Sequence, residues 1–162
     1  MPEPQSDFLA LLGTLAKHHV DFIVVGGVAA VLQGAPIATF DLDVVHSRSS
    51  ENIDRVLKAL DDLSASYRTA AGLKLSSPGH QLLMTRFGPL DLLGLIGKGR
   101  GYHELLPDSS IIRVDPKLAV RILDLGMVIR TKEEAGHEKD AAGLAILRRT
   151  LEEKNLRRSC GR

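Results

Sequence analysis

Two aspartates that flank a leucine, Asp41-Leu42-Asp43, are the residues of this chain whose spacing best suits chemistry. They open an apolar run that ends at Val45 and is typical of a strand. Side chains two positions apart on a strand point to the same face, about 6.5–7 Å apart. Neighbouring negative charges repel each other unless a cation relieves the repulsion, and oxygen ligands placed this way suit Mg²⁺. The pair therefore predicts a divalent-cation site.

A glycine pair, Gly26-Gly27, lies between an earlier apolar run, Phe22 to Val25, and a short apolar helix predicted from Val28 to Leu32. Glycine lets the backbone approach a ligand closely, and the first N–H groups of a helix can bind phosphate. Taken alone, the glycine pair could be a plain turn and the aspartate strand a half-solvated edge. Together, on consecutive elements, they favour a site for a metal ion and a phosphate.

A third aspartate, Asp91, lies inside a later apolar run, Leu90 to Leu93. Charged side chains are seldom buried without a partner, so this position needs an explanation. Either Asp91 points into water from an edge strand, or the fold brings it beside Asp41 and Asp43 as a third carboxylate.

Two other polar segments allow both a structural and a functional interpretation. Asn52 and Arg55 belong to a helix predicted after the aspartate strand, and they are either surface residues or contributors to the site. The glycine-rich segment Gly94 to Gly101 contains Lys98 and Arg100. It is either a flexible connector or a loop that contacts phosphate.

The elements that must position these residues follow from hydrophobic periodicity and turn signals. Residues 64–78 are predicted to form a loop with a short strand at Leu73-Leu75. We predict an α/β (α+β) fold in one domain, residues 1–154, with a mixed sheet flanked by helices, and a disordered basic tail, residues 155–162. The expected helices are 7–19, 51–63, 125–135 and 137–153, and the expected hairpins join 81–87 to 90–93 and 111–114 to 118–123.

Composition narrows the class of protein further. The net charge of +1 over 162 residues argues against a broad electrostatic footprint for duplex nucleic acid. The single cysteine, Cys160, excludes an internal disulfide and fits a reducing compartment. No apolar run approaches the length that spans a bilayer, and the first residues lack the pattern of a secretory signal. We therefore expect a cytoplasmic protein without a membrane partner.

The order of these motifs resembles the signature of the nucleotidyltransferase superfamily, whose catalytic core is like that of DNA polymerase beta. The signature has a hydrophobic residue and a glycine pair, a spacer, and then an Asp-hydrophobic-Asp strand, here Gly26-Gly27 and Asp41 to Asp43. Thr39, Asp91 and Lys132 extend the resemblance to small bacterial nucleotidyltransferase-like proteins. Those proteins are related to the abortive-infection and toxin–antitoxin nucleotidyltransferases.

The resemblance implies a minimal nucleotidyltransferase fold with C-terminal helices and a metal-dependent enzyme. Such an enzyme transfers a nucleoside monophosphate from a nucleoside triphosphate to an acceptor hydroxyl and releases pyrophosphate. The acceptor could be a tRNA end, a protein or a small molecule. The implied catalytic residues and ligands of two Mg²⁺ ions are Asp41, Asp43 and Asp91. The implied nucleotide-binding residues are Gly26, Gly27, Thr39 and Lys132.

A second interpretation is a non-catalytic relative that acts as a binding or regulatory partner, such as one component of a toxin–antitoxin pair with its cognate toxin or antitoxin protein. Three departures from the family pattern bear on this choice. Many relatives carry serine at the position of Gly27, arginine at the position of Ile37, and Gly-Arg where this chain has Gly136-His137. Each change removes a possible phosphate contact, and none removes a carboxylate.

Overall fold

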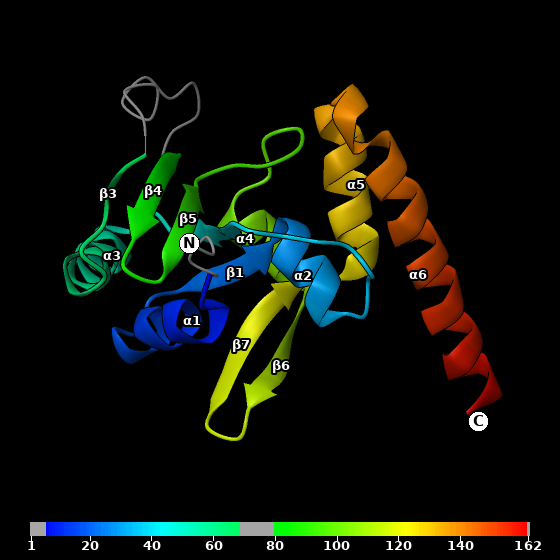
Figure 1. The fold of residues 1–162 in the computed structure, drawn as a ribbon, viewed down its shortest axis with the longest axis horizontal. Coiled ribbons are helices and arrows are strands. Elements are labelled where there is room, and N and C mark those ends of the chain that lie inside the picture. Colours follow the sequence, from blue (N-terminus) through cyan, green and yellow to red (C-terminus); the bar gives the residue numbers. More distant parts are fainter. Residues whose placement is uncertain (1–5, 69–79, 162) are drawn as a thin grey trace, which may run out of the picture.

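The computed structural model describes residues 6–68 and 80–161 (Figure 1). The strand predicted at Leu73-Leu75 lies outside these residues. Short 3₁₀ turns, η2 (Leu106–Asp108) and η3 (Glu138–Asp140), accompany the longer elements. The helices and strands, in chain order, are α1 (Phe8–Lys17), β1 (Phe22–Val25), α2 (Gly26–Leu32), β2 (Leu42–His46), α3 (Ser50–Asp62), β3 (Ser66–Tyr67), β4 (Gln81–Thr85), β5 (Gly88–Leu93), α4 (Tyr102–Leu105), β6 (Ser109–Asp115), β7 (Leu118–Leu123), α5 (Leu125–Ala135) and α6 (Ala141–Cys160).

The strands form one mixed sheet in the order β3-β4-β5-β2-β1-β7-β6. Strand β1 pairs antiparallel with β2 and parallel with β7, and β2 pairs parallel with β5. Both predicted hairpins are confirmed, as β4–β5 and β6–β7. The predicted α/β fold with a mixed sheet and C-terminal helices is therefore what the chain forms.

The hydrophobic core surrounds the central strand β1, all four residues of which are buried. Strand β1 has a neighbouring strand on each side and helices over the sheet, so no face of it reaches water. Helix α1 contacts α3 at one end of the molecule, whereas α5 contacts α2 and α6 at the other (Figure 1). This arrangement places α5 and the loop before α4 beside the ends of β2 and β5.

Asn52 is a structural residue, because its side chain is fully buried between α3 and the start of β1. Its Oδ1 accepts a hydrogen bond of 2.7 Å from the N–H of Asp21. Its Nδ2 donates to the carbonyls of Asp21 and Ser47, at 3.1 and 2.7 Å. Asn52 is therefore neither a surface residue nor a contributor to the site, and both interpretations are wrong. The sequence could not show this, because the contact joins segments that are far apart in the chain.

Replacing Asn52 by alanine should lower the free energy of unfolding by at least about 2 kcal/mol, because it removes three hydrogen bonds to the backbone of Asp21 and Ser47 and leaves the Asp21 N–H without its acceptor. Urea denaturation followed by circular dichroism measures the change. The neighbouring substitution Glu51→Ala, at an exposed position of the same helix, should change stability by less than about 0.5 kcal/mol. Equal effects of the two substitutions would contradict the structural role of Asn52.

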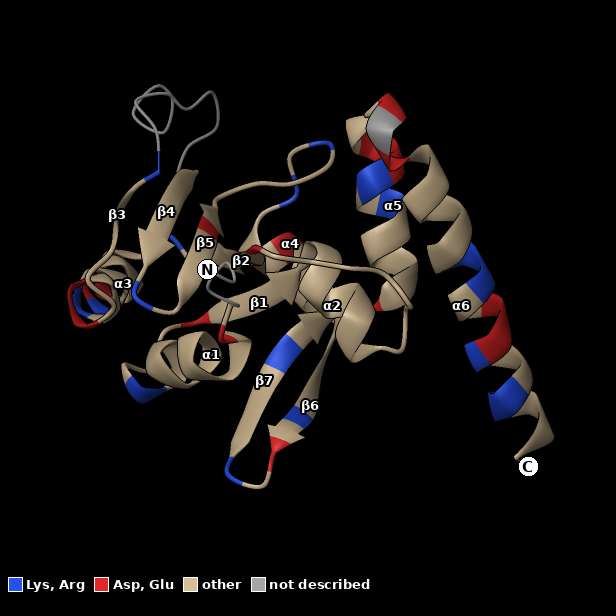
Figure 2. Ribbon diagram, viewed as in Figure 1, with Lys and Arg blue, Asp and Glu red and all other residues tan. Residues whose placement is uncertain are grey.

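The predicted disordered tail is wrong for Asn155 to Cys160, which continue helix α6. Arg149 pairs with Glu152 and Glu153 one turn further along, and such pairs stabilise a helix surface. Figure 2 shows basic and acidic residues interspersed along α6, and basic residues in the last turn suit the helix dipole. This charge pattern, which lacks an apolar stripe, explains why periodicity did not predict the extension.

Helix α6 is also the longest helix of residues 6–68 and 80–161, but its charges make it too polar to cross a membrane. Across those residues, no helix combines the length and the apolar character of a membrane span.

Candidate active site

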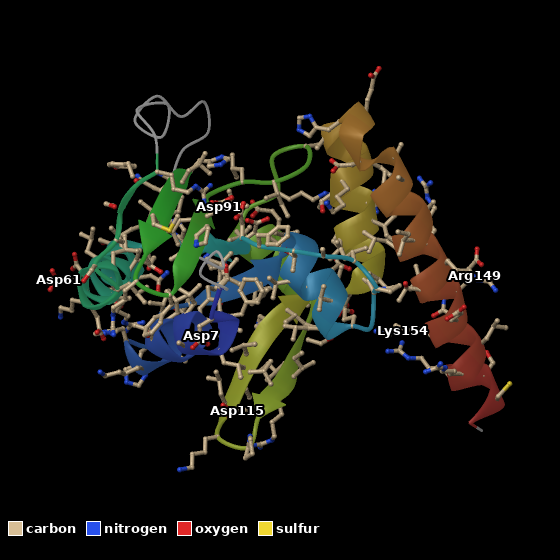
Figure 3. All side chains as sticks on the ribbon, in the orientation of Figure 1. Asp7, Asp61, Asp91, Asp115, Arg149 and Lys154 are labelled. Atoms are coloured by element: carbon tan, nitrogen blue, oxygen red, sulfur yellow. The ribbon has the colours of Figure 1, made fainter. Side chains whose placement is uncertain are left out.

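The parallel pairing of β2 with β5 places Asp43 directly opposite Asp91. Paired residues on adjacent strands point to the same face and lie about 5 Å apart. Figure 3 shows Asp91 on β5, on the side of the sheet toward α5. Two aspartates that are 48 positions apart in the chain are therefore neighbours on one surface of the sheet.

Each of these two carboxylates has a buried oxygen atom that accepts no hydrogen bond from the described residues. In the part of the chain that the structure describes, Oδ1 of Asp43 and Oδ1 of Asp91 are the two buried side-chain oxygen or nitrogen atoms without a hydrogen-bond partner. Burying a carboxylate oxygen without a partner is costly, so each such atom calls for an explanation.

The environment of Asp43 favours its neutral form. The pKa of Asp43 is raised from 3.8 to about 8, first by burial and then by the charge and hydrogen bonding of Asp91 and the charge of Asp41. The positive charge of Lys132 acts in the opposite direction and lowers the pKa of Asp43. In the absence of a cation, Asp43 therefore carries a proton at neutral pH.

Asp41 lies just before β2 and is partly buried. Its charge reaches Asp43, since it raises the pKa of that residue. Among residues 6–68 and 80–161, however, no group of three or more histidine, cysteine, aspartate or glutamate side chains is gathered closely enough to hold a metal ion. The structure thus brings Asp43 and Asp91 together and leaves Asp41 nearby but outside a compact triad.

Gly26 allows the backbone to pass close to Asp43. It begins α2 with a φ of +63°, and a Cβ atom there would lie 2.5 Å from Oδ2 of Asp43. Any side chain at this position would be strained and would displace the carboxylate.

Gly27 packs against Thr39 instead of facing the carboxylates. A Cβ atom on Gly27 would lie 2.6 Å from Thr39 Oγ1 and 2.9 Å from Thr39 Cβ. The Thr39 hydroxyl itself lies 3.5 Å from the carbonyl oxygen of Asp41. The sequence-based interpretation gave Gly26 and Gly27 the same task, but the structure gives each a different neighbour.

Replacing Gly27 by serine should therefore lower stability by about 1–3 kcal/mol, because the new Cβ overlaps Thr39. Thermal unfolding measures the effect. Gly143, a helical glycine of α6 whose Cβ would meet nothing within 4 Å, provides the matched control. Gly143→Ala should be neutral or stabilise by about 0.5–1 kcal/mol. A stable Gly27→Ser protein would mean that Thr39 moves aside easily.

Lys132 faces the carboxylate pair across a cavity of about 380 Å³. Its Nζ lies 4.0 Å from Oδ1 of Asp140. The sheet contributes the two predicted carboxylates to the lining, α2 contributes Gly26, and α5 contributes Lys132. The cavity is lined by Val25, Gly26, Asp43, His80, Asp91, Leu93, Leu95, Ile96, Gly97, Val128, Thr131, Lys132, Ala135, His137 and Asp140.

Four of the predicted site residues, Gly26, Asp43, Asp91 and Lys132, thus share one cavity, whereas Gly27, Thr39 and Asp41 do not line it. A larger cavity of about 680 Å³ lies under α3 and contains none of the predicted residues. It is lined by residues such as His46 on β2 and Leu92 on β5. Side chains alternate between the two faces of a strand, so this cavity lies on the face of the sheet opposite Asp43 and Asp91. The smaller cavity is therefore the candidate active site.

The glycine-rich segment before α4 is held against α5. Arg100 Nε and Nη2 donate to Glu134 Oε1 and Oε2, at 2.7 and 2.9 Å. A Cβ on Gly97 would lie 2.7 Å from the same Glu134 carboxylate. The interpretation as a flexible connector is wrong, because this two-pronged ion pair fixes the segment as a wall of the cavity.

Sequence reasoning missed Arg68, which directly follows β3 and has its Nη2 2.6 Å from Oδ1 of Asp91. An arginine in a polar loop carries no pattern that would have indicated this contact. The role of Asp41, Asp43 and Asp91 as metal ligands, and of Lys132, Gly26, Gly27 and Thr39 in nucleotide binding, stays a prediction.

The comparisons with known proteins support the fold. No protein-family model matches this sequence. No curated protein matches it either. A solved structure from Thermotoga maritima, named a "putative nucleotidyltransferase", superposes with a TM-score of 0.59 at 16% sequence identity. The match covers 90% of this chain and 91% of that chain. The chain therefore has a nucleotidyltransferase-like fold over most of its length.

Proposed function

We propose that this protein is a metal-dependent nucleotidyltransferase. It transfers a nucleoside monophosphate from a nucleoside triphosphate to an acceptor hydroxyl and releases pyrophosphate. The observation that carries the proposal is the pair of adjacent, largely buried carboxylates, Asp43 and Asp91, whose Oδ1 atoms accept no hydrogen bond from the described residues, in a cavity that also holds Lys132. The nucleotidyltransferase-like fold supports it.

The donor set fits Mg²⁺. That ion takes oxygen ligands, and one or two carboxylates are sufficient when water and substrate phosphates complete its coordination. Asp43 would hold the ion together with Asp41, and Asp91 would complete the acidic site. When bound, the ion would polarise the phosphate and stabilise charge on the attacking and leaving oxygens. Oδ1 of Asp43, which is costly to bury without a hydrogen bond, would then have a partner.

The other residues of the cavity bind and orient the substrate. Lys132 attracts the triphosphate from the α5 side, and the bare backbone at Gly26 leaves room for a phosphate beside Asp43. The acceptor oxygen forms a bond to the α-phosphorus, the bond from this phosphorus to the bridging oxygen breaks, and pyrophosphate leaves with the electron pair. The proton of the acceptor hydroxyl passes to Asp91.

The test is incubation of the protein with each α-labelled nucleoside triphosphate, Mg²⁺ and a cell extract. We expect at least one nucleotide to label an acceptor in the extract, and no label to be transferred from the γ-position. Asp43→Asn should abolish labelling, and the exposed control Asp54→Asn, on α3, should preserve it. Nucleotide binding without labelling of any acceptor would contradict the proposed transferase activity. It would favour a non-catalytic regulatory partner, such as a toxin–antitoxin component.

A further inference from the structure

The contact between Arg68 and Asp91 places a fixed positive charge inside the carboxylate site. The Arg68 side chain is 20% exposed and that of Asp91 is 15% exposed, so both ends of the pair are largely withdrawn from water. Arg68 is the residue after β3, and its backbone N–H donates to the carbonyl of Leu82 on β4. The guanidinium therefore reaches Asp91 across the β4 strand from the edge of the sheet.

This ion pair differs from the partly buried Arg100–Glu134 pair of the cavity wall. Arg100 makes three aligned hydrogen bonds to both carboxylate oxygens of Glu134. Arg68 instead directs Nη1 at the carbonyl of Leu83, at 3.3 Å, and Oδ1 of Asp91 accepts no aligned hydrogen bond from the described residues. The Arg68–Asp91 interaction is thus an ion pair without an aligned hydrogen bond, although the two atoms lie 2.6 Å apart. Oδ1 of Asp91 can therefore still accept a hydrogen bond.

We propose that Arg68 takes the place of a second cation at Asp91, so that the site binds a single divalent ion centred on Asp43. This inference rests on the proposed function and specifies its cation requirement. One divalent ion together with Arg68 balances the three carboxylates of Asp41, Asp43 and Asp91. Two divalent ions beside Arg68 would leave two positive charges uncompensated. The second ion and the Arg68 guanidinium would then repel each other strongly, because little water screens charges in this part of the site.

The test counts bound Mn²⁺ by electron paramagnetic resonance, with the full chain and Mn²⁺ alone at saturating concentration. The number of Mn²⁺ ions bound by the Asp43→Asn protein measures binding to the surface, and it is subtracted from the count for each other protein. We expect one site ion for the wild type and two for Arg68→Gln, which keeps much of the side-chain length and loses the charge. Arg68→Lys should bind one ion, because the positive charge remains. Arg86→Gln is the matched control, since Arg86 lies in the β4–β5 turn and pairs with Asp62.

Two results overturn the inference and leave the proposed function intact. One is a wild-type count of two ions, which does not depend on the folding of any variant. The other is a folded Arg68→Gln protein that binds one ion with unchanged affinity. If neither the wild type nor Arg68→Gln binds any Mn²⁺ beyond the Asp43→Asn background, the metal site of the proposed function fails, and the inference fails with it.

Discussion

Asp43→Asn should reduce nucleotide transfer by about 10³-fold or more and, at the same time, make the cation-free protein more stable. The loss of transfer follows from the loss of the buried carboxylate that would hold the ion. The gain in stability follows from the raised pKa of Asp43, because asparagine resembles the neutral carboxyl group but cannot ionise. A residue with a structural role alone would show the opposite change in stability.

The gain in stability should depend on pH in a defined direction. Because the pKa of Asp43 is about 8 in the folded chain and 3.8 without the fold, the folded state holds the proton more tightly. Wild-type stability therefore falls as pH rises from about 4 to about 8, and it changes little from this cause above pH 8. The variant lacks this loss, so the two proteins should be equally stable near pH 4.

Urea unfolding of both proteins at a series of pH values tests this expectation. At pH 8 the variant should be more stable by at least about 2 kcal/mol, since each unit of pKa shift corresponds to about 1.4 kcal/mol. Asp54→Asn should follow the wild type across the whole range. A variant that is less stable than the wild type at pH 8 would show that the Asp43 carboxylate is needed for folding.

The second large effect is the pH dependence of cation affinity. A divalent ion must displace the proton of Asp43 to bind, so affinity for Mn²⁺ should rise about tenfold per pH unit well below pH 8, and about 50-fold from pH 6 to pH 8. Above pH 8 the affinity should level off, because Asp43 is then already ionised. Mn²⁺ is used without nucleotide, so that no phosphate group titrates in the same range.

Calorimetric titration in two buffers with different ionisation enthalpies measures the proton directly. Close to one proton should be released per Mn²⁺ bound at pH 6.5, and close to none at pH 9.5. Affinity that does not change between pH 6 and pH 8 would show that the ion does not bind at Asp43.

The local elements could be predicted from the sequence because their signals are local. The run Phe22 to Val25 predicted β1, and the runs 81–87 and 90–93 predicted the β4–β5 hairpin, since apolar runs act over a few positions. The expected turn at Gly88-Pro89 is wrong, because these residues begin β5 and the chain turns at Arg86-Phe87. The neighbouring positions of Asp43 and Asp91 depend on a parallel pairing of distant strands, which no periodicity reveals. The resemblance to nucleotidyltransferases, and not the pattern of residues, suggested that pairing.

The contacts that sequence reasoning missed are made between side chains from separate parts of the chain. Asn52 bonds to Asp21, and Arg68 approaches Asp91, although neither residue lies in a recognisable motif. The different surroundings of Gly26, beside Asp43, and Gly27, beside Thr39, could not be predicted for a similar reason. A positive φ and a close approach belong to the folded backbone, so the composition of the turn could not show which glycine needs them.

The most direct measurement of the central claim is a crystal structure with Mn²⁺ and a nucleoside triphosphate analogue that cannot be cleaved at the α-phosphate. Anomalous diffraction locates the Mn²⁺ without ambiguity. We predict Mn²⁺ in direct coordination with a carboxylate oxygen of Asp43, and the triphosphate in the cavity between Gly26 and Lys132. Mn²⁺ and nucleotide bound elsewhere, for instance in the larger cavity under α3, with the Asp43–Asp91 pair unliganded, would contradict the assignment of this site.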